Sequence, residues 1–197
     1  MLAPGFSDPV LASQAVFRSV MEAMARPGLI AAVAADVAPP APLGIAAASL
    51  ALTLLDFETP VWLDHDLAGA ADIAGWFKFH TGASITAEPG AAAFAFIADP
   101  ADMPAFDRFC LGSVEYPDRS TTLVLQVERL SEGGPFRLTG PGIKGARALS
   151  ASPLPPELVD RMAANRALFP RGVDVILACG RELAALPRSV HLVKEPT

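Results

Sequence analysis

The sequence has 197 residues, enough to bury a hydrophobic core without disulfides or metal ions to reinforce it. Only 18% of the residues are charged, and the formal net charge is −6. An acidic chain offers no basic surface for phosphates, which excludes nucleic acids and anionic membranes as partners.

The first predicted element is an amphipathic helix that begins at Asp8-Pro9. Aspartate caps the first turn of a helix, and proline fits its first position. The segment Arg26-Pro27-Gly28 ends the helix, because proline disfavours helical backbone in the residue before it. We expect the apolar stripe of this helix, including its Phe and Met side chains, to pack in the core. The stripe consists of Val10, Val16, Phe17, Val20, Met21 and Met24.

Helical and strand patterns then alternate as far as residue 120. Short apolar runs bounded by turn residues predict strands, and longer amphipathic or apolar runs predict helices. The uncharged run 37–55 does not predict a membrane-spanning helix, because Pro39, Pro40, Pro42 and Gly44 interrupt it. We predict strands at 29–33, 59–63 and 92–97, helices at 45–55, 73–80 and 103–110, and a polar loop at 112–120.

The last quarter of the chain predicts the centre of a sheet. Residues 173–179 form an apolar run between Gly172 and Gly180, which is typical of a strand buried on both faces. Residues 189–193 predict a shorter strand at an edge of the sheet, since Pro187 precedes it and proline cannot donate to a ladder.

A hairpin is predicted between residues 121–127 and 136–139, with Gly133-Gly134-Pro135 as its turn. A helix is predicted from Pro155 to Leu168. Strands that alternate with helices, together with one hairpin, indicate an α/β fold with a mixed sheet. We therefore expect a single domain over residues 1–197, folded as a three-layer α/β/α sandwich.

The segment Gly140-Pro141-Gly142-Ile143-Lys144-Gly145 has the letters of a dinucleotide-binding fingerprint and follows a predicted strand. That fingerprint also needs a helix that opens at its third glycine and an acidic residue about 20 positions later at the end of a second strand. Neither context is present, and Pro141 removes a backbone N–H that a phosphate would use. We therefore interpret residues 140–145 as a structural turn.

No residue pattern predicts a catalytic centre or a metal site. His65, His80 and His191 are isolated from one another, and neither cysteine lies near a histidine at the spacing of metal ligands. Asp64 and Asp66 flank His65, which we interpret as part of a hydrated loop.

Cysteine usage and the N-terminus bear on the compartment. Cys110 and Cys179 are too few and too far apart for a disulfide framework. The N-terminal residues lack the basic and apolar regions of a signal peptide. We therefore expect a cytoplasmic protein.

The segment Tyr116-Pro117-Asp118-Arg119-Ser120-Thr121-Thr122 places an acid, an arginine and three hydroxyls at the mouth of a predicted strand. In one interpretation Asp118 pairs with Arg119 and the hydroxyls satisfy the backbone of the loop. In the other, the segment is a lip that binds an anion or a partner chain, since a planar guanidinium grips carboxylates and phosphates. The residues leave both interpretations open. The candidate residues for binding a partner or an anion are Asp118, Arg119, Ser120, Arg171 and Arg188.

The arginines at strand mouths and loop ends lead to two further expectations. Arg171 and Arg188 lie at the ends of predicted strands, where solvated charge is the first interpretation. We expect Arg119 to dock a partner subunit. We expect Arg26, between a helix end and Pro27, to brace its own loops.

Several stretches of the sequence match the pattern of a known family. They are Gly5-Phe6 through Asp8-Pro9, Ser13-Gln14, Phe17-Arg18, Met24-Ala25-Arg26-Pro27-Gly28, and residues 117–127, 138–143 and 169–189. Together they cover somewhat under half of the chain, in the same order as in the family, and residues 64–112 carry none of them. In these stretches the chain resembles the PhnH family, a subunit of the bacterial carbon–phosphorus lyase.

The resemblance implies a subunit of the carbon–phosphorus lyase core complex, through which bacteria use alkylphosphonates as a phosphorus source. It implies a structural or assembly role in forming ribose 1-alkylphosphonate 5-triphosphate from ATP and alkylphosphonate. The implied partners are the other core subunits and a second copy of the chain in a homodimer. The competing interpretation is an independent nucleotide- or anion-binding enzyme that uses residues 140–145 or the lip at Arg119.

The resemblance also implies a fold related to the pyridoxal-phosphate-dependent transferases without their cofactor site. A Schiff-base lysine needs a pocket and an acidic partner for the pyridine ring. Lys78, Lys144 and Lys194 are the only lysines, and none ends a predicted strand beside such an aspartate. We expect no cofactor and no catalytic step in the isolated chain.

Overall fold

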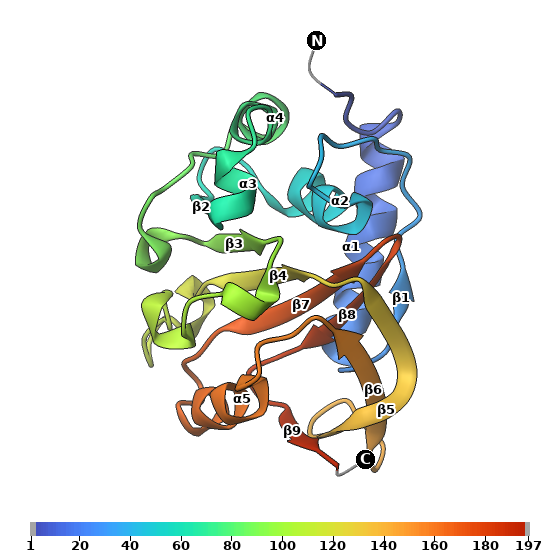
Figure 1. Ribbon diagram of the computed structural model, residues 1–197, viewed down its shortest axis with the longest axis vertical. Helices are drawn as coiled ribbons and strands as arrows, with labels where there is room; N and C mark the ends of the chain where they lie inside the picture. Colours follow the sequence, from blue (N-terminus) through green and yellow to red (C-terminus); the bar gives the residue numbers. More distant parts are fainter. Residues whose placement is uncertain (1–2, 196–197) are drawn as a thin grey trace.

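The computed structural model describes residues 3–195, and a six-stranded mixed sheet runs through its middle (Figure 1). Its order is β1-β8-β7-β4-β3-β2, in which β2, β3, β4 and β7 are parallel and β8 and β1 are antiparallel to their neighbours. The strands are β1 (Ala31–Ala32), β2 (Val61–Leu63), β3 (Phe94–Ile97), β4 (Thr122–Gln126), β7 (Asp174–Cys179) and β8 (Glu182–Leu186).

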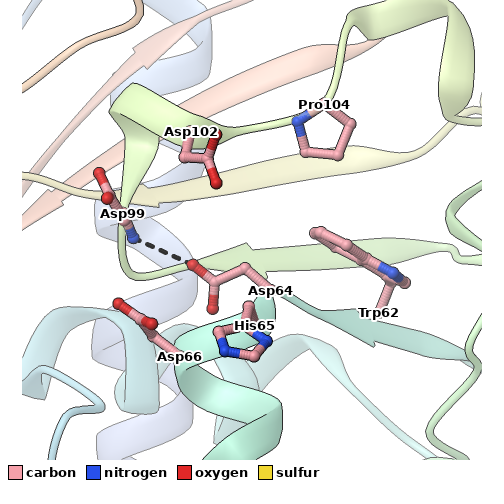
Figure 2. Close-up of a pocket in the computed structure, with 7 residues that line it drawn as sticks. All are labelled: Trp62, Asp64, His65, Asp66, Asp99, Asp102 and Pro104. Carbon is pink, nitrogen blue, oxygen red and sulfur yellow. Dashed lines mark hydrogen bonds between the residues drawn. The ribbon is translucent and has the colours of Figure 1, made fainter.

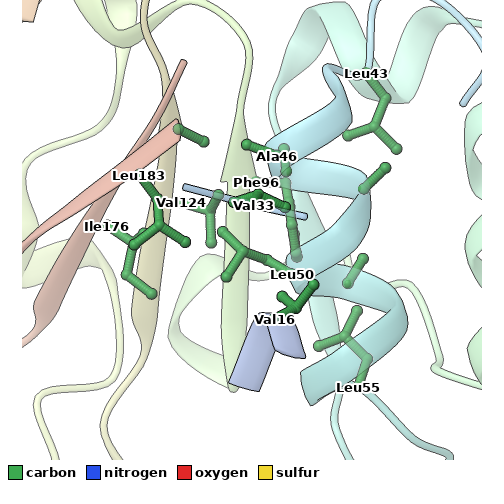
Figure 3. Close-up of a cluster of buried hydrophobic side chains, with 14 of the residues drawn as sticks. Val16, Val33, Leu43, Ala46, Leu50, Leu55, Phe96, Val124, Ile176 and Leu183 are labelled. Atoms are coloured by element: carbon green, nitrogen blue, oxygen red, sulfur yellow. The ribbon is translucent and has the colours of Figure 1, made fainter. Parts of the chain in front are cut away.

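The central strands bury side chains on both faces of this sheet. In β4, Val124 joins one hydrophobic cluster, while Leu123 and Leu125 join the other. Figure 3 shows the first cluster, where Val124 meets Leu50 and Val16 from the helices. That face is covered by α1 (Pro9–Ala25), α2 (Ile45–Leu54), the short α3 (His65–Gly69) and α4 (Ile73–Thr81).

The second face is covered by one helix and a second sheet. The helix is α5 (Leu158–Ala167), and the antiparallel sheet has the order β6-β5-β9 (Figure 1). Its strands are β5 (Arg129–Thr139), β6 (Arg147–Ser152) and β9 (His191–Lys194). The fold class is therefore α/β with a mixed sheet, and the layer that we expected to be helical is shared between α5 and strands.

The best-predicted elements are those whose signals are local. Asp8 caps α1 by accepting the N–H of Leu11 at 3.1 Å, and Gly28 has a φ of 74° beyond the helix end. Strand β7 lies between β4 and β8 with its apolar side chains buried, as the run of residues 173–179 predicts. The helices expected at 45–55 and 73–80 are α2 and α4.

The predicted hairpin is wrong. Strand β4 pairs with β3 and β7, whereas β5 continues through Gly133 and Gly134 as a bulged strand of the second sheet. Both glycines have positive φ, 78° and 99°, so they supply a bulge within a strand and not the end of one. Leu130 and Leu138 of β5 are buried in the second hydrophobic cluster, which also contains side chains of α5. The strand therefore packs against the face of the main sheet and does not pair with β4.

Other predicted elements change type or extent. The helix expected at 103–110 is reduced to a 3₁₀ turn at Phe106–Arg108, because Pro104 interrupts it and the carbonyls of Met103 and Pro104 accept hydrogen bonds from Arg161. The strand at 29–33 shrinks to Ala31–Ala32. The edge strand at 189–193 is found as β9, but in the second sheet. β6, β8 and α3 were not predicted.

The apolar stripe of α1 is only partly in the core, which corrects our expectation. Val16 and Val20 are buried. Val10, Phe17 and Met21 are 66%, 49% and 52% exposed. The helix therefore carries two adjacent apolar faces, and only one of them faces the sheet.

Candidate docking site at the amino edge of the sheet

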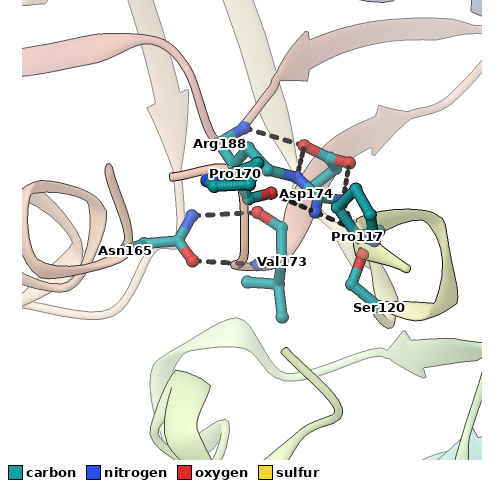
Figure 4. Close-up of polar contacts among 7 residues, drawn as sticks. All are labelled: Pro117, Ser120, Asn165, Pro170, Val173, Asp174 and Arg188. Atoms are coloured by element: carbon teal, nitrogen blue, oxygen red, sulfur yellow. Dashed lines mark hydrogen bonds and ion pairs between the residues drawn. The ribbon is translucent and has the colours of Figure 1, made fainter. Parts of the chain in front are cut away.

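Arg188, just after β8, lies at the centre of the polar contacts that precede β4 and β7 (Figure 4). Its Nη2 lies 2.6 Å from Oδ2 of Asp174, its Nε lies 3.2 Å from Oδ1, and its backbone N–H donates to the same Oδ1 at 2.7 Å. Asp174 is the first residue of β7. Only 13% of the Arg188 side chain and 16% of the Asp174 side chain are exposed. This is a bidentate, largely buried ion pair.

The remaining donors of Arg188 join two loops. Nη1 donates to the carbonyl of Pro117 at 2.9 Å and to that of Pro170 at 3.1 Å, and Nη2 donates to the hydroxyl of Ser120. An arginine side chain carries five N–H donors. All of them have acceptors within the chain, so Arg188 braces the edge of the sheet and has no donor left for a ligand.

Asn165 reinforces the same edge from α5. Its amide accepts the N–H of Val173 and donates to the carbonyl of Val173, both at 2.9 Å, as a neighbouring strand would. Asn165 is 2% exposed, and Gly172, at φ 125°, leaves no room for a side chain beside it. Sequence reasoning missed Asn165; a polar residue on the buried side of a predicted helix was the available signal.

The lip itself is exposed, in contrast to its base. The guanidinium of Arg119 lies 4.2 Å from the centre of the Tyr116 ring, and among the described residues no carboxylate lies within ion-pair distance of it. The local Asp118–Arg119 pair is therefore absent. Asp118 is exposed, as are Tyr116 (53%) and Val114 (65%).

The lip stands on rigid loops. Thr121 donates its hydroxyl to the carbonyl of Ala92 at 2.6 Å and accepts the N–H of Cys110 at 3.1 Å. Gly172 N–H donates to the carbonyl of Leu111 at 2.8 Å, which ties the loop before β7 to the loop that leads to the lip. Arg171, half-buried, lies beside Pro170 in the loop before β7. The bracing therefore brings Arg119 and Arg171 to one edge, with the exposed Phe169 nearby in sequence.

This edge is the amino end of the parallel strands, whereas ligands of open α/β sheets bind at the carboxyl ends. The carboxyl ends of β2 and β3 do form a pocket of about 240 Å³, lined by Trp62, Asp64, His65 and other residues (Figure 2). Asp64 is 7% exposed and accepts the N–H groups of Leu67, Ala98 and Asp99. Our interpretation of a hydrated loop is therefore wrong for Asp64, which caps α3 and ties β2 to the turn after β3.

Residues 140–145 form a turn from which no helix opens. Gly142 has a φ of 78°, and a Cβ there would overlap the carbonyl oxygen of Ala25 at the end of α1. Arg147, after the turn, donates to the carbonyls of Arg26 and Pro27 at 3.0 and 3.1 Å. The geometry is that of a packing turn, as the interpretation of this segment predicts.

Arg147, and not Arg26, braces the end of α1. Arg26 pairs at 2.9 Å with Glu22, one turn earlier, and 61% of its side chain is exposed. Exposed pairs at this spacing contribute only a few tenths of a kcal/mol. The expected bracing role therefore belongs to Arg147.

Within residues 3–195, no three His, Cys, Asp or Glu side chains converge in a way that could hold a metal ion. Over the same residues, no helix combines the length and the apolar character needed to cross a membrane.

The fold and this site define a class: an α/β protein with a mixed sheet whose amino edge is internally braced and presents an exposed arginine and aromatic side chains. A family model described as bacterial phosphonate metabolism protein (PhnH) matches residues 4–193. The chain belongs to the PhnH family, which confirms the resemblance found in the sequence.

Two relatives support this assignment. The chain is 47% identical over 190 residues to the alpha-D-ribose 1-methylphosphonate 5-triphosphate synthase subunit PhnH of Rhizobium meliloti (strain 1021), covering 96% of this chain and 94% of the relative. It is 44% identical over 82 residues to the putative C-P lyase subunit protein HtxG of Stutzerimonas stutzeri, covering 42% of each chain.

Proposed function

We propose that this chain is an assembly subunit of a synthase that forms ribose 1-alkylphosphonate 5-triphosphate from ATP and an alkylphosphonate. It acts as one domain in the cytoplasm, together with the other carbon–phosphorus lyase core subunits and a second copy of itself. The near full-length similarity to a subunit of such a synthase supports this role. The observation that carries the assembly role is the saturation of Arg188, which turns the amino edge of the sheet into a firm support.

The lip is the proposed contact with another subunit. Arginine and tyrosine are the residues most enriched in the energetic centres of protein interfaces. Arg119 stacked on Tyr116 is held in place before binding, so little side-chain entropy is lost on docking. Asp118 and Arg171 flank this pair as partners for opposite charges, while Ser120 and Arg188 position the lip from below.

The competing function is an independent enzyme that binds a nucleotide or another anion. The free guanidinium of Arg119 is the observation in its favour, because phosphates and carboxylates are its natural ligands. The turn at residues 140–145 supports it less, since the turn leads into strand β6 and not into a helix N-terminus.

The likeness to pyridoxal-phosphate-dependent transferases, without their cofactor site, is also part of the proposal. All three lysines are exposed, whereas a Schiff-base lysine needs a pocket: Lys78 is on α4, Lys144 is in the turn, and Lys194 is the last residue of β9.

Substituting Arg119 by alanine tests the docking role. Arg119→Ala should weaken association with the other synthase subunits by about 1–3 kcal/mol, measured by co-purification and titration calorimetry, because an interface anchor is truncated. The melting temperature of the isolated chain should stay unchanged, since Arg119 is exposed and its guanidinium lies over the exposed Tyr116 ring.

Arg137→Ala is the matched control. Arg137 is also an exposed arginine, paired with Glu195 on the second sheet and away from the lip. Its substitution should leave both association and melting temperature unchanged. Complete assembly with Arg119→Ala would contradict the docking role, and a lowered melting temperature would mean that Arg119 supports the fold instead.

A further inference from the structure

Helix α1 exposes an apolar face that no other described residue covers. Val10, Leu11, Phe17 and Met21 are 66%, 64%, 49% and 52% exposed, although Val16 and Val20 of the same helix are buried. An amphipathic helix of a monomer normally turns polar residues outward. Four large apolar side chains on the outer side of one helix therefore call for a partner surface.

The spacing of this outer face matches that of a helix pair. Val10, Gln14, Phe17 and Met21 are all exposed and follow one another at intervals of four, three and four residues. Alternating steps of four and three are the a and d positions of a coiled-coil seam. Gln14 is the single polar residue in that seam, and such a residue fixes the register in which two helices pair.

We propose that the outer face of α1 packs against the same face of a second copy, antiparallel, about a two-fold axis between Gln14 and Phe17. This inference rests on the proposed homodimer and names its interface. A two-fold dimer brings one patch against itself, so the patch must be self-complementary.

The face of α1 meets that requirement. In the antiparallel register Val10 lies opposite Met21 of the partner subunit, and Gln14 lies opposite Phe17 of the partner subunit. Every layer of the seam then joins a smaller or polar residue to a larger apolar one. Leu11 lies beside Arg18 of the partner subunit, whose aliphatic stem can cover it while the guanidinium stays in water.

The helix dipoles favour the same direction. The two helix dipoles oppose each other, whereas a parallel pair would align them.

Sedimentation of charge variants tests the interface. The wild-type chain should sediment as two copies at micromolar concentration, and Phe17→Glu should sediment as one copy, because two carboxylates would be buried beside the axis. Phe17 is half-exposed, so the variant should keep its circular dichroism and melting temperature. Phe79→Glu is the matched control, since Phe79 is 70% exposed on α4, and it should remain a pair of copies.

Cross-linking tests the antiparallel register. A chain with both Val10→Cys and Met21→Cys should be joined to its copy by a short bis-maleimide reagent. Within one helix the two positions lie about 16 Å apart, beyond a short linker. Each single variant should give no more cross-linked pair than the wild type, whose Cys110 and Cys179 set the background.

The outcomes separate the two proposals. A wild-type chain that sediments as a single copy would overturn the homodimer, and with it this interface. A pair of copies that survives Phe17→Glu would keep the homodimer and overturn the α1 face. Efficient cross-linking of Met21→Cys alone would overturn the antiparallel register.

Discussion

Arg188 shows how a polar residue at a strand end acquires its role from its surroundings. In the sequence it is one of several arginines near prolines, and nothing there indicates which hydrogen-bond acceptors it contacts. In the structure it reaches Asp174, Ser120 and the carbonyls of Pro117 and Pro170. These acceptors come from two loops and a strand, so they meet only after the sheet has formed.

Removal of Arg188 should be costly. Arg188→Ala removes the cation that pairs with the carboxylate of Asp174. Only 16% of the Asp174 side chain is exposed, so its charge would be left largely buried and unpaired. Breaking a buried pair in this way costs about 3–5 kcal/mol, reduced here toward the lower figure by the remaining exposure. The free energy of unfolding, measured by urea titration of the isolated chain, checks the result.

Arg188→Lys is the control for charge. It keeps the cation but loses the planar fork that reaches several acceptors at once, so it should recover only part of the stability. Wild-type stability of Arg188→Ala, combined with a loss of subunit association, would place Arg188 in the docking surface instead of beneath it.

At the scale of elements, the turn at residues 140–145 joins the second sheet to the end of α1. Gly142 lies against the last turn of α1, and Arg147 holds the carbonyls just beyond it. The letters that resemble a nucleotide-binding loop are thus explained by a close approach between two segments of backbone. Glycine is needed because a side chain would occupy the space of a carbonyl oxygen.

Two glycine variants separate backbone strain from overlap. Gly142 and Gly145 have nearly equal φ angles, 78° and 77°, but only Gly142 is crowded, since nothing lies within 4 Å of a Cβ at Gly145. Gly145→Ala should cost about 1 kcal/mol from strain alone, and Gly142→Ala should cost more than about 2 kcal/mol. Thermal and urea unfolding measure both values. Equal losses for the two variants would show that the contact with α1 contributes nothing.

At the scale of the whole molecule, the two edges of the sheet differ in character. The amino edge carries the braced lip, and the carboxyl edge carries the acidic pocket around Asp64. Acidic side chains repel phosphates, and all the donors of Arg188 are used within the chain. An anion at the amino edge would therefore meet the exposed guanidinium of Arg119.

A thermal-shift measurement checks this view. ATP or methylphosphonate added to the isolated chain should leave the melting temperature unchanged, because we expect the one exposed guanidinium of Arg119 to offer too few contacts to hold a polyanion. A ligand present at a hundred times its dissociation constant would add about 2.7 kcal/mol of stability, which is readily seen. A shift with ATP that disappears in Arg119→Ala would favour the competing anion-binding function.

Local signals in the sequence determined much of the frame. The Asp8-Pro9 start of α1, the buried run of β7 and the structural character of residues 140–145 each depend on neighbouring residues, and each is found in the structure. The family resemblance rests on the same local stretches. An alanine-rich strand such as β8 gave no such signal, because alanine is uncommon in strands and only its pairing with β7 and β1 decides its state.

Tertiary structure alone decided which apolar side chains are buried and which polar side chains have all their hydrogen bonds satisfied within the chain. The periodicity of α1 marks Val16 and Phe17 equally as apolar, yet only Val16 faces the sheet. Arginine at positions 119 and 188 is chemically the same residue, yet only Arg188 finds acceptors for all its donors. Hydrophobicity and charge belong to a residue, whereas burial and hydrogen-bond saturation depend on segments far away in the chain that fold against it.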